Sequence, residues 1–326
     1  MKVLIIGKGI TGSVLYYLFR RAGHSVTVIE SRFRKFYPTL IHSLLLKDKD
    51  IELAIESKKF YEEYNIPMIN YPSYTLGKVD PKVVDEWLSY NFNVKEKFVD
   101  WLNTHAIVGE GTDSLVNVKK LVDSVPFVEG VAKIKKGKVI INNGKEVKAD
   151  VVILTSGAWN TYSVDIKLPL KSYYCWAWVT TNRNSLLDKT LIYDYELNYY
   201  SRPLFGLGMN LNIVGDGDLL PSSPFIKQNG DLKPVERAKE RLGELKPVIR
   251  GEGYCEGTPD MRPLYGKIMD NIYIVAGLDG YGAEVGPGMA KLLFEFITNG
   301  REEKEYTINR FSSVNDFELG KEPHEL

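Results

Sequence analysis

The first thirty residues constrain the fold most strongly, because a glycine motif stands between two short apolar runs. Val3-Leu4-Ile5-Ile6 precedes Gly7-Lys8-Gly9-Ile10-Thr11-Gly12, and a helical pattern over residues 10–22 leads to Val26-Thr27-Val28-Ile29. This order predicts a strand, a helix and a second parallel strand. The three glycines would provide a tight turn, close approach of the backbone to a pyrophosphate, and close packing of helix on strand. The helix N-terminus would then bind the phosphates.

Glu30 follows the second apolar run, where a dinucleotide-binding fold has an acidic residue. Its carboxylate can accept hydrogen bonds from both ribose hydroxyl groups and would repel a 2′-phosphate, which disfavours NADP. FAD and NAD share the ribose and the pyrophosphate, so this motif alone does not decide between them.

The overall composition is that of a folded protein without an excess of charge. The 326 residues include 42 basic and 42 acidic side chains, so the charge balance gives no indication of nucleic acid or an anionic membrane as partner. The length allows two domains. No apolar run approaches membrane-spanning length, so we expect no membrane insertion and no signal peptide. Two cysteines, Cys175 and Cys255, are typical of a reducing compartment, and we expect a cytoplasmic protein.

Two later segments also predict a backbone close to a ligand. The segment 150–159, Asp-Val-Val-Ile-Leu-Thr-Ser-Gly-Ala-Trp, begins as a strand buried on both faces of a parallel sheet and ends in a glycine turn. Residues 271–277 form a second buried strand, which a glycine-rich stretch follows up to Gly288. A helix expected over 289–298, begun by Pro287, would point its N-terminus into the same glycine-lined space.

Between Leu168 and Val214 the pattern becomes an aromatic-rich alternation, which predicts an antiparallel sheet in a domain of its own. We also expect helical segments over residues 81–88, 96–102, 115–125 and 234–245.

Three motifs in this order resemble the FAD-dependent D-amino-acid oxidase, glycine oxidase and sarcosine oxidase family. They are the N-terminal glycine motif with Glu30, the segment 150–159, and residues 257–266, Gly-Thr-Pro-Asp-Met-Arg-Pro-Leu-Tyr-Gly, with Ala276–Gly282. The resemblance implies an α/β architecture, with a Rossmann-like FAD-binding domain and a second, antiparallel-sheet α+β substrate domain. We assign residues 1–65, 105–165 and 255–326 to the discontinuous FAD-binding domain, and residues 66–104 and 166–254 to the substrate domain.

The resemblance also implies that the cofactor is FAD, for which non-covalent binding is favoured over attachment through Cys255. Helix N-terminal N–H groups near residues 282–287 would stabilise the negative charge of a reduced flavin. The residues expected to bind the cofactor are Gly7, Gly9, Ile10, Thr11, Gly12, Glu30, Ser31, Arg32, Val131, Ser156, Gly157, Trp159, Gly280, Tyr281, Gly282, Ala283, Glu284 and Val285.

The reaction that the resemblance implies is oxidation of a carbon–nitrogen bond by hydride transfer to flavin N5, followed by hydrolysis of the imine. We therefore expect a small-molecule amine or amino-acid substrate and no metal site. A homo-oligomer and a separate electron-acceptor subunit both stay open. Candidates for the catalytic, substrate-facing side are Tyr200, Arg202, Cys255, Tyr281 and Glu284.

Two departures from the family pattern leave the substrate open. Cys255 stands where glycine and D-amino-acid oxidases have a carboxylate-binding arginine, and Glu284 stands where sarcosine oxidases have a lysine of similar role. Either the anion site is rebuilt from Arg202, Arg262 or Arg32, or the substrate is an amine or another cation that Glu284 attracts. A non-catalytic or auxiliary flavoprotein subunit of a larger dehydrogenase complex is the alternative function. An NAD-dependent dehydrogenase is a further alternative, against which the C-terminal glycine segment argues.

Overall fold

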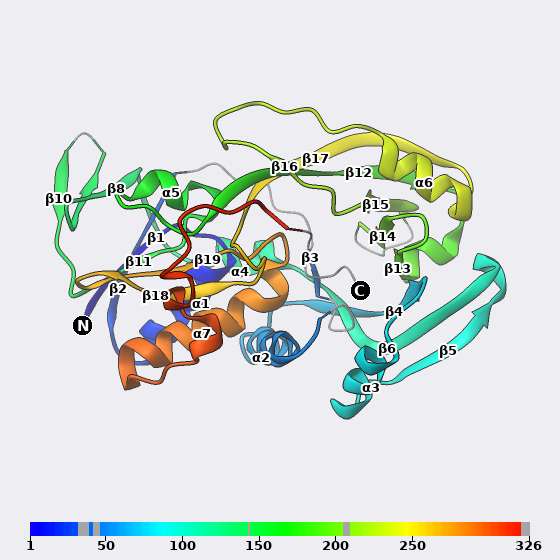
Figure 1. Ribbon diagram of the computed structural model, residues 1–326, viewed down its shortest axis with the longest axis horizontal. Coiled ribbons are helices and arrows are strands. Elements are labelled where there is room, and N and C mark those ends of the chain that lie inside the picture. The colour runs from blue at the N-terminus through cyan, green and yellow to red at the C-terminus, as the bar shows by residue number, and fades with distance from the viewer. Residues whose placement is uncertain (32–38, 42–45, 143, 205–208, 321–326) are drawn as a thin grey trace.

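The computed structural model describes residues 1–31, 39–41, 46–142, 144–204 and 209–320. Arg32, one of the predicted cofactor and anion ligands, lies outside these residues. In Figure 1 a six-stranded sheet with its helices occupies the left half of the molecule, and a ten-stranded sheet curves through the right half. The predicted α/β class with a second sheet region is confirmed.

The six-stranded sheet has the order β18-β19-β11-β1-β2-β7, and all its strands except β18 run parallel. Alternate residues of β1 enter different cores, because Val3 and Ile5 pack on one side of the sheet and Leu4 and Ile6 on the other. A parallel sheet buried on both faces explains the unbroken apolar runs in the sequence. Its strands are β1 (Lys2–Ile6), β2 (Ser25–Glu30), β7 (Val128–Glu129), β11 (Val151–Leu154), β18 (Leu264–Met269) and β19 (Ile272–Ala276).

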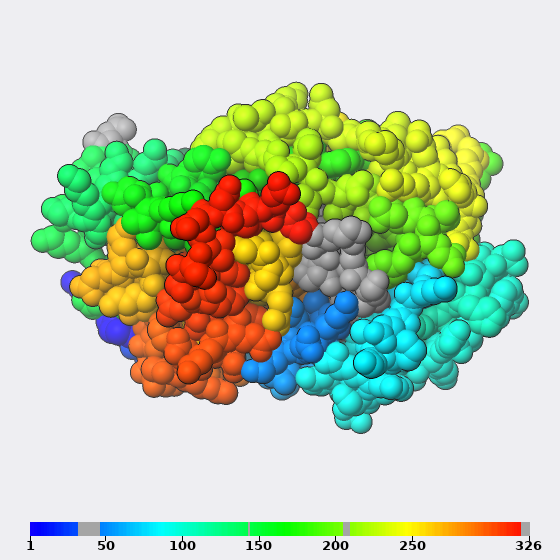
Figure 2. Space-filling model, viewed as in Figure 1, coloured from blue at the N-terminus to red at the C-terminus, as the bar shows by residue number. Residues whose placement is uncertain are grey.

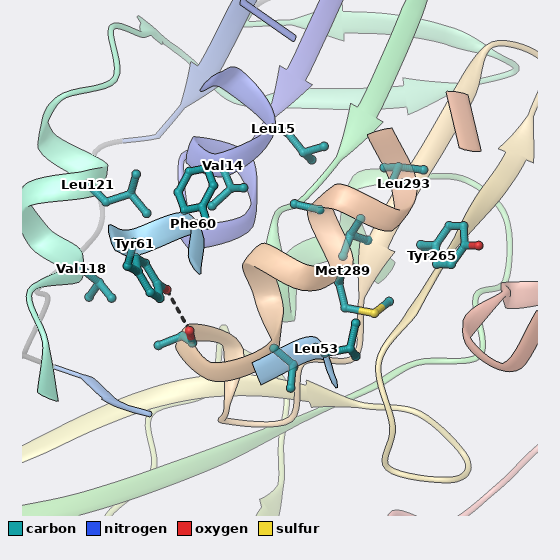
Figure 3. Close-up of a cluster of buried hydrophobic side chains, with 14 of the residues drawn as sticks. Val14, Leu15, Leu53, Phe60, Tyr61, Val118, Leu121, Tyr265, Met289 and Leu293 are labelled. Carbon is teal, nitrogen blue, oxygen red and sulfur yellow. Dashed lines mark hydrogen bonds between the residues drawn. The ribbon is translucent and has the colours of Figure 1, made fainter. Parts of the chain in front are cut away.

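Two long helices, α1 (Ile10–Arg21) and α7 (Gly282–Asn299), cover one face of this sheet, and α2 (Lys49–Glu63) packs against α7. Their shared core includes Leu15, Phe60 and Met289, whose side chains converge around α7 (Figure 3). A small antiparallel sheet of β8 (Ala132–Lys135), β9 (Lys138–Ile141) and β10 (Lys145–Val147) packs against the other face. Within the described ranges, no helix has the length and hydropathy that crossing a bilayer requires.

The ten-stranded sheet has the main order β16-β12-β15-β14-β13-β4-β6-β3, with β17 paired to β12 and β5 paired to β6. Helix α6 (Lys233–Leu242) covers one of its faces, where Val235 and Ala238 pack against Ile192 and Val214. Its strands are β3 (Thr39–Ile41), β4 (Met68–Leu76), β5 (Val94–Val99), β6 (Thr104–Val116), β12 (Lys171–Asn182), β13 (Leu191–Asp194), β14 (Tyr199–Pro203), β15 (Leu211–Gly215), β16 (Leu220–Pro221) and β17 (Leu245–Gly257).

In this region one helix prediction is wrong and the bounds of another are too wide. Residues 96–102 belong to strand β5 and a following 3-10 turn, because β5 pairs with β6 along its whole length. Of residues 115–125, the first two end β6, and helix α4 covers only Val118–Asp123. Strand β6 belongs to the ten-stranded sheet, although we assigned residues 105–165 to the FAD-binding domain. The domain boundaries themselves remain a prediction. The helix expected over 81–88 is present as α3 (Pro81–Ser89).

Helix α7 begins at Gly282 and contains Pro287, whereas the sequence predicted a start after that proline. A proline inside a helix removes one N–H and leaves the carbonyl group four residues earlier without its helical partner. That carbonyl belongs to Ala283, and the hydroxyl group of Tyr61 donates a hydrogen bond to it at 2.8 Å (Figure 3). A side chain from α2 thus replaces the missing backbone donor.

The segment after α7 crosses one face of the molecule, where it is drawn in red in Figure 2. Arg310 in this segment binds Asp260 through two nitrogen–oxygen contacts of 2.9 and 3.1 Å. The same guanidinium donates to the carbonyl oxygens of Arg262 and Pro263. These contacts hold the C-terminal segment against the motif at residues 257–266.

Candidate functional site

The turn from β1 to α1 requires glycine at two of its three motif positions. Gly7 has a φ of +105°, and a Cβ atom added there would lie 2.3 Å from the carbonyl oxygen of Thr155. A Cβ atom on Gly12 would lie 2.0 Å from the carbonyl oxygen of Gly7. The motif therefore permits both the tight turn and the close packing of α1 on the sheet.

The groups around this turn fit a dinucleotide. Gly9 caps α1 without a side-chain hydrogen bond, and the first turn of α1 has no acidic residue, so its N–H groups suit an anion. Glu30 ends β2, and its carboxylate accepts hydrogen bonds from the backbone N–H of Lys8 at 2.6 Å and of Ser31 at 2.9 Å. Ile10 and Thr11 form the first turn of α1, and Val131 stands exposed just beyond β7. These donors and the carboxylate match a pyrophosphate and a ribose.

The start of α7 lies beside the start of α1, although the two are far apart in the sequence. A Cβ atom on Gly286 would lie 3.2 Å from Oγ1 of Thr11. The loop before α7 is held in left-handed backbone conformations, with φ of +67° at Gly277 and +83° at Gly280. The first turns of α7 therefore pack against the first turn of α1.

A buried polar chain connects three of the predicted segments. The N–H of Ser156 donates to Oδ1 of Asn160 at 2.8 Å, and Nδ2 of Asn160 donates to Oε1 of Glu256 at 2.7 Å. The same oxygen accepts the N–H of Gly277 at 3.3 Å. Burial raises the pKa of Glu256 to about 8, so this carboxyl group is mainly protonated at neutral pH. These hydrogen bonds support the turn that contains Gly157 and Trp159, in which Gly157 adopts a φ of +55°.

Strand pairing places the aromatic and cationic candidates on one face of the ten-stranded sheet, opposite the face that α6 covers. Tyr193 lies opposite Tyr200, and Arg202 lies opposite Ile213. Residues directly opposite one another in a sheet project to the same side. The ring of Tyr200 lies over Gly215, where an added Cβ atom would meet its hydroxyl oxygen at 2.5 Å.

Arg202 places a positive charge on this face of the sheet. Its Nη1 atom is buried and makes no hydrogen bond within the described part of the chain. Burial lowers the pKa of Arg202, and the groups that oppose this shift are Tyr200 and Tyr193 rather than a carboxylate. An arginine keeps its charge in such surroundings. The guanidinium therefore has unused capacity to bind an anion.

Arg262, a second candidate for the anion site, is already engaged. Its Nη2 and Nε atoms contact the Asp50 carboxylate at 2.9 and 3.2 Å, and its Nη1 contacts Glu305 at 2.7 Å. The hydroxyl group of Tyr306 donates to the same Asp50 carboxylate at 2.5 Å. This cluster joins α2 to the C-terminal segment. All three guanidinium nitrogens of Arg262 thus already have partners.

Two buried carboxylates lie near the same aromatic residue as Arg202. Glu284 in the first turn of α7 and Asp113 on β6 are both fully buried. Burial raises the pKa of Tyr193 well above its ordinary value, and the charges of Asp113 and Glu284 add to this while Arg202 opposes it. Tyr193 therefore stands within electrostatic reach of a cation and of two acids.

Lys58 on α2 extends this group. Its Nζ donates to the carbonyl oxygen of Thr112 at 2.5 Å, and burial lowers its pKa, against the charges of Asp113, Glu62 and Glu284. Sequence reasoning missed Lys58, Asp113 and Tyr193, as it missed Asn160 and Glu256. The signal in the sequence that could have indicated a buried polar site was a charged or amide residue next to a predicted ligand-binding turn, such as Asn160 directly after residues 157–159.

The two remaining catalytic candidates have partners of their own. The hydroxyl group of Tyr281 donates to the carbonyl oxygen of Met261 at 3.3 Å, and the ring is buried. The Sγ atom of Cys255 lies 3.4 Å from that of Cys175 on the neighbouring strand. The roles of all the predicted site residues remain predictions.

Comparisons with known proteins agree with this geometry. Residues 122–296, more than half of the chain, match the family model described as FAD dependent oxidoreductase. An L-proline dehydrogenase from P. horikoshii has a similar structure, with a TM-score of 0.79 and 19% identity over 97% of this chain and 99% of that one. A glycine oxidase from Geobacillus kaustophilus gives a TM-score of 0.76 and 15% identity over 97% and 99%. An iminodiacetate oxidase from Chelativorans sp. BNC1 gives a TM-score of 0.74 and 15% identity, over 94% of this chain and 98% of that one. A search of the curated proteins returned no match.

Proposed function

The chain belongs to the FAD-dependent oxidoreductase family, and on that premise we propose that it oxidises the carbon–nitrogen bond of an amino acid. The observation that carries the proposal is the Arg202 guanidinium, whose buried Nη1 atom makes no hydrogen bond to the residues that the structure describes. The similar solved structures of an L-proline dehydrogenase and a glycine oxidase support the same reaction class. A binding site for a carboxylate distinguishes an amino acid from a simple amine.

The two helix starts and Glu30 would hold non-covalent FAD. Free N–H groups at the start of α1 suit the pyrophosphate, and the Glu30 carboxylate suits the ribose hydroxyl groups. The start of α7 would face the flavin ring, where its N–H groups favour negative charge. When bound, the flavin supplies the acceptor for the substrate hydride at its N5 atom.

The chain's own residues would orient the substrate. Arg202 would bind the carboxylate through charge-assisted hydrogen bonds, which its planar guanidinium can form in pairs. Glu284 and Asp113 act electrostatically on the same tyrosine, Tyr193, and would provide the negative potential that attracts the amino group of a zwitterion. Holding both ends fixes the carbon–hydrogen bond relative to the flavin, and burial of the site excludes water.

The location of the protein completes the proposal. We place it in the cytoplasm, as a protein that acts on a small molecule. The low cysteine content, two in 326 residues, supports a reducing compartment.

Anaerobic mixing of the purified holoprotein with a substrate panel tests this function. The panel pairs each L- and D-amino acid with the amine that lacks its carboxyl group, and the loss of flavin absorbance is followed. We expect one or more amino acids to bleach the flavin and their amines to fail. Bleaching by the amine alone would overturn the carboxylate site. Bleaching by dithionite but by no member of the panel would identify an auxiliary flavoprotein subunit, and a colourless protein that binds NAD would identify a nicotinamide enzyme.

A further inference from the structure

We propose that Cys175 and Cys255 form a redox pair that closes reversibly to a disulfide between β12 and β17. They are the only cysteines among the 326 residues, and their Sγ atoms lie 3.4 Å apart. Both thiols are partly exposed, so a small oxidant can reach them. The proposal rests on the geometry of these strands and is independent of the substrate.

The strand register explains why the thiols meet. Tyr173 lies opposite Cys255, and Cys175 lies opposite Gly253, so the cysteines are diagonal neighbours on one face of the sheet. The twist of a sheet brings one diagonal pair closer than the other. Closing the bond requires the two sulfurs to approach to about 2.05 Å. Gly253 gives β17 room to move, because nothing lies within 4 Å of the position its Cβ would occupy.

The same face of the sheet carries the proposed substrate residues. Val179 on β12 lies opposite Ile213 on β15, and Ile213 lies opposite Arg202 on β14. Residues 173, 175 and 179 alternate to that side of β12. The hydroxyl group of Tyr173 also donates to Oδ1 of Asp279 at 2.5 Å, in the loop that leads into α7. A bond between Cys175 and Cys255 would therefore lock two strands beside the site.

Hydrogen peroxide is the oxidant we propose. One thiolate attacks a peroxide oxygen and the oxygen–oxygen bond breaks, which gives a sulfenic acid and, after hydroxide takes up a proton, water. The second sulfur then attacks the sulfenic sulfur, the sulfur–oxygen bond breaks, and a second water leaves. Two thiols and one peroxide thus give one disulfide and two waters. A dithiol reductant reverses the reaction by thiol–disulfide exchange.

Peptide mapping of the holoprotein tests the pair. The protein is treated with one equivalent of hydrogen peroxide, the remaining thiols are blocked with a maleimide, and the digest is analysed by mass spectrometry. We expect a peptide pair that joins residues 175 and 255, disappears after dithiothreitol, and forms poorly when the protein is oxidised in denaturant. Two maleimide-labelled cysteines after oxidation, links between different chains, or a flavin attached to the Cys255 peptide would each overturn the proposal.

Matched variants test the two-step chemistry. In Cys175→Ser the sulfenic acid on Cys255 has no neighbour to react with, so dimedone should trap it, and the reciprocal variant Cys255→Ser should expose the sulfenic acid on Cys175. The same dimedone adduct should be scarce in the wild-type protein, because the second thiol consumes the sulfenic acid. Equal dimedone labelling of the wild type and both variants would contradict the proposal.

Discussion

The hydroxyl group of Tyr61 donates a hydrogen bond of 2.8 Å to the carbonyl oxygen of Ala283. Pro287, four residues further along α7, has no N–H with which to satisfy that carbonyl. One turn earlier in α2, Oγ of Ser57 accepts the N–H of Gly288 at 3.1 Å. Helix α2 thus supplies both a donor and an acceptor to the part of α7 that faces the proposed flavin site.

Replacing Tyr61 by phenylalanine should lower the free energy of unfolding by about 1–3 kcal/mol, because the buried carbonyl of Ala283 loses its donor. Urea unfolding measures the change. Tyr90→Phe is the matched control, since Tyr90 makes a more exposed hydrogen bond to Glu52 at 3.3 Å, and its effect should stay within about 0.5 kcal/mol. Equal losses in the two variants would show that the contact to Ala283 has no special importance.

Stability should depend on pH through Glu256. Burial raises its pKa from 4.5 to about 8, so the folded state binds this proton more tightly than the unfolded state does. The stabilising contribution is complete below about pH 4.5 and is lost as the pH rises to about 8. Glu256→Gln removes this titration. The stability of the variant minus that of the wild type should therefore increase between pH 5 and pH 8, by at most about 1.4 kcal/mol per pH unit, and level off above.

Urea unfolding of both proteins from pH 5 to pH 9 measures this difference. Taking the difference cancels other groups that titrate in the same window, such as Asp216, whose pKa burial raises to about 6. A difference that stays constant across the whole range would contradict the burial of an ionisable carboxyl at position 256.

Affinity for FAD should depend on Glu30. Glu30→Gln keeps the shape of the side chain but loses the charge that strengthens hydrogen bonds to the ribose, so affinity should fall about 10- to 100-fold. Fluorescence titration of the apoprotein with FAD gives the dissociation constant. Glu129→Gln is the control, because Glu129 pairs with Glu30 in the neighbouring strand and its side chain is exposed. Equal affinity of the two variants for FAD would contradict the proposed contact between Glu30 and the ribose.

The dinucleotide turn could be predicted because all its signals are local in the sequence. The glycines, the apolar runs and Glu30 lie within one strand–helix–strand unit. The structure of segment 96–102 could not be predicted in this way. The spacing of Phe98 and Leu102 suits a helix, but residues 96–99 form a strand because they pair with β6. The start of α7 could not be predicted either, because a proline usually breaks a helix. The donor that replaces the missing N–H of Pro287 is the hydroxyl group of Tyr61, more than two hundred residues earlier.

In the candidate site, too, the features that the sequence could not predict depend on tertiary contacts. The sequence offers Arg202, Arg262 and Arg32 as alternative anion ligands, and only tertiary structure shows that Asp50 and Glu305 already engage Arg262. The Asn160–Glu256 hydrogen bond joins residues from two distant segments, so no local pattern could predict their contact.

The two arginines should therefore respond differently to the same substitution. Arg262→Met leaves the buried carboxylate of Asp50 without its guanidinium partner and should lower the free energy of unfolding by about 1–3 kcal/mol, given partial exposure of the pair. Arg202→Met removes a cation that burial penalises and that has no carboxylate partner among the described residues, so it should leave stability unchanged or raised. Urea unfolding of the two variants distinguishes these roles, and the reverse order would contradict them.

The most direct test of the account is anaerobic stopped-flow reduction of the flavin by the best amino-acid substrate, which gives the dissociation constant of the substrate. Arg202→Met should raise that constant about 10- to 100-fold, because the carboxylate loses a charge-assisted partner. Arg262→Met, studied where it is fully folded, should leave it within about twofold. An unchanged constant in Arg202→Met, or an equal increase in both variants, would contradict Arg202 as the carboxylate-binding residue.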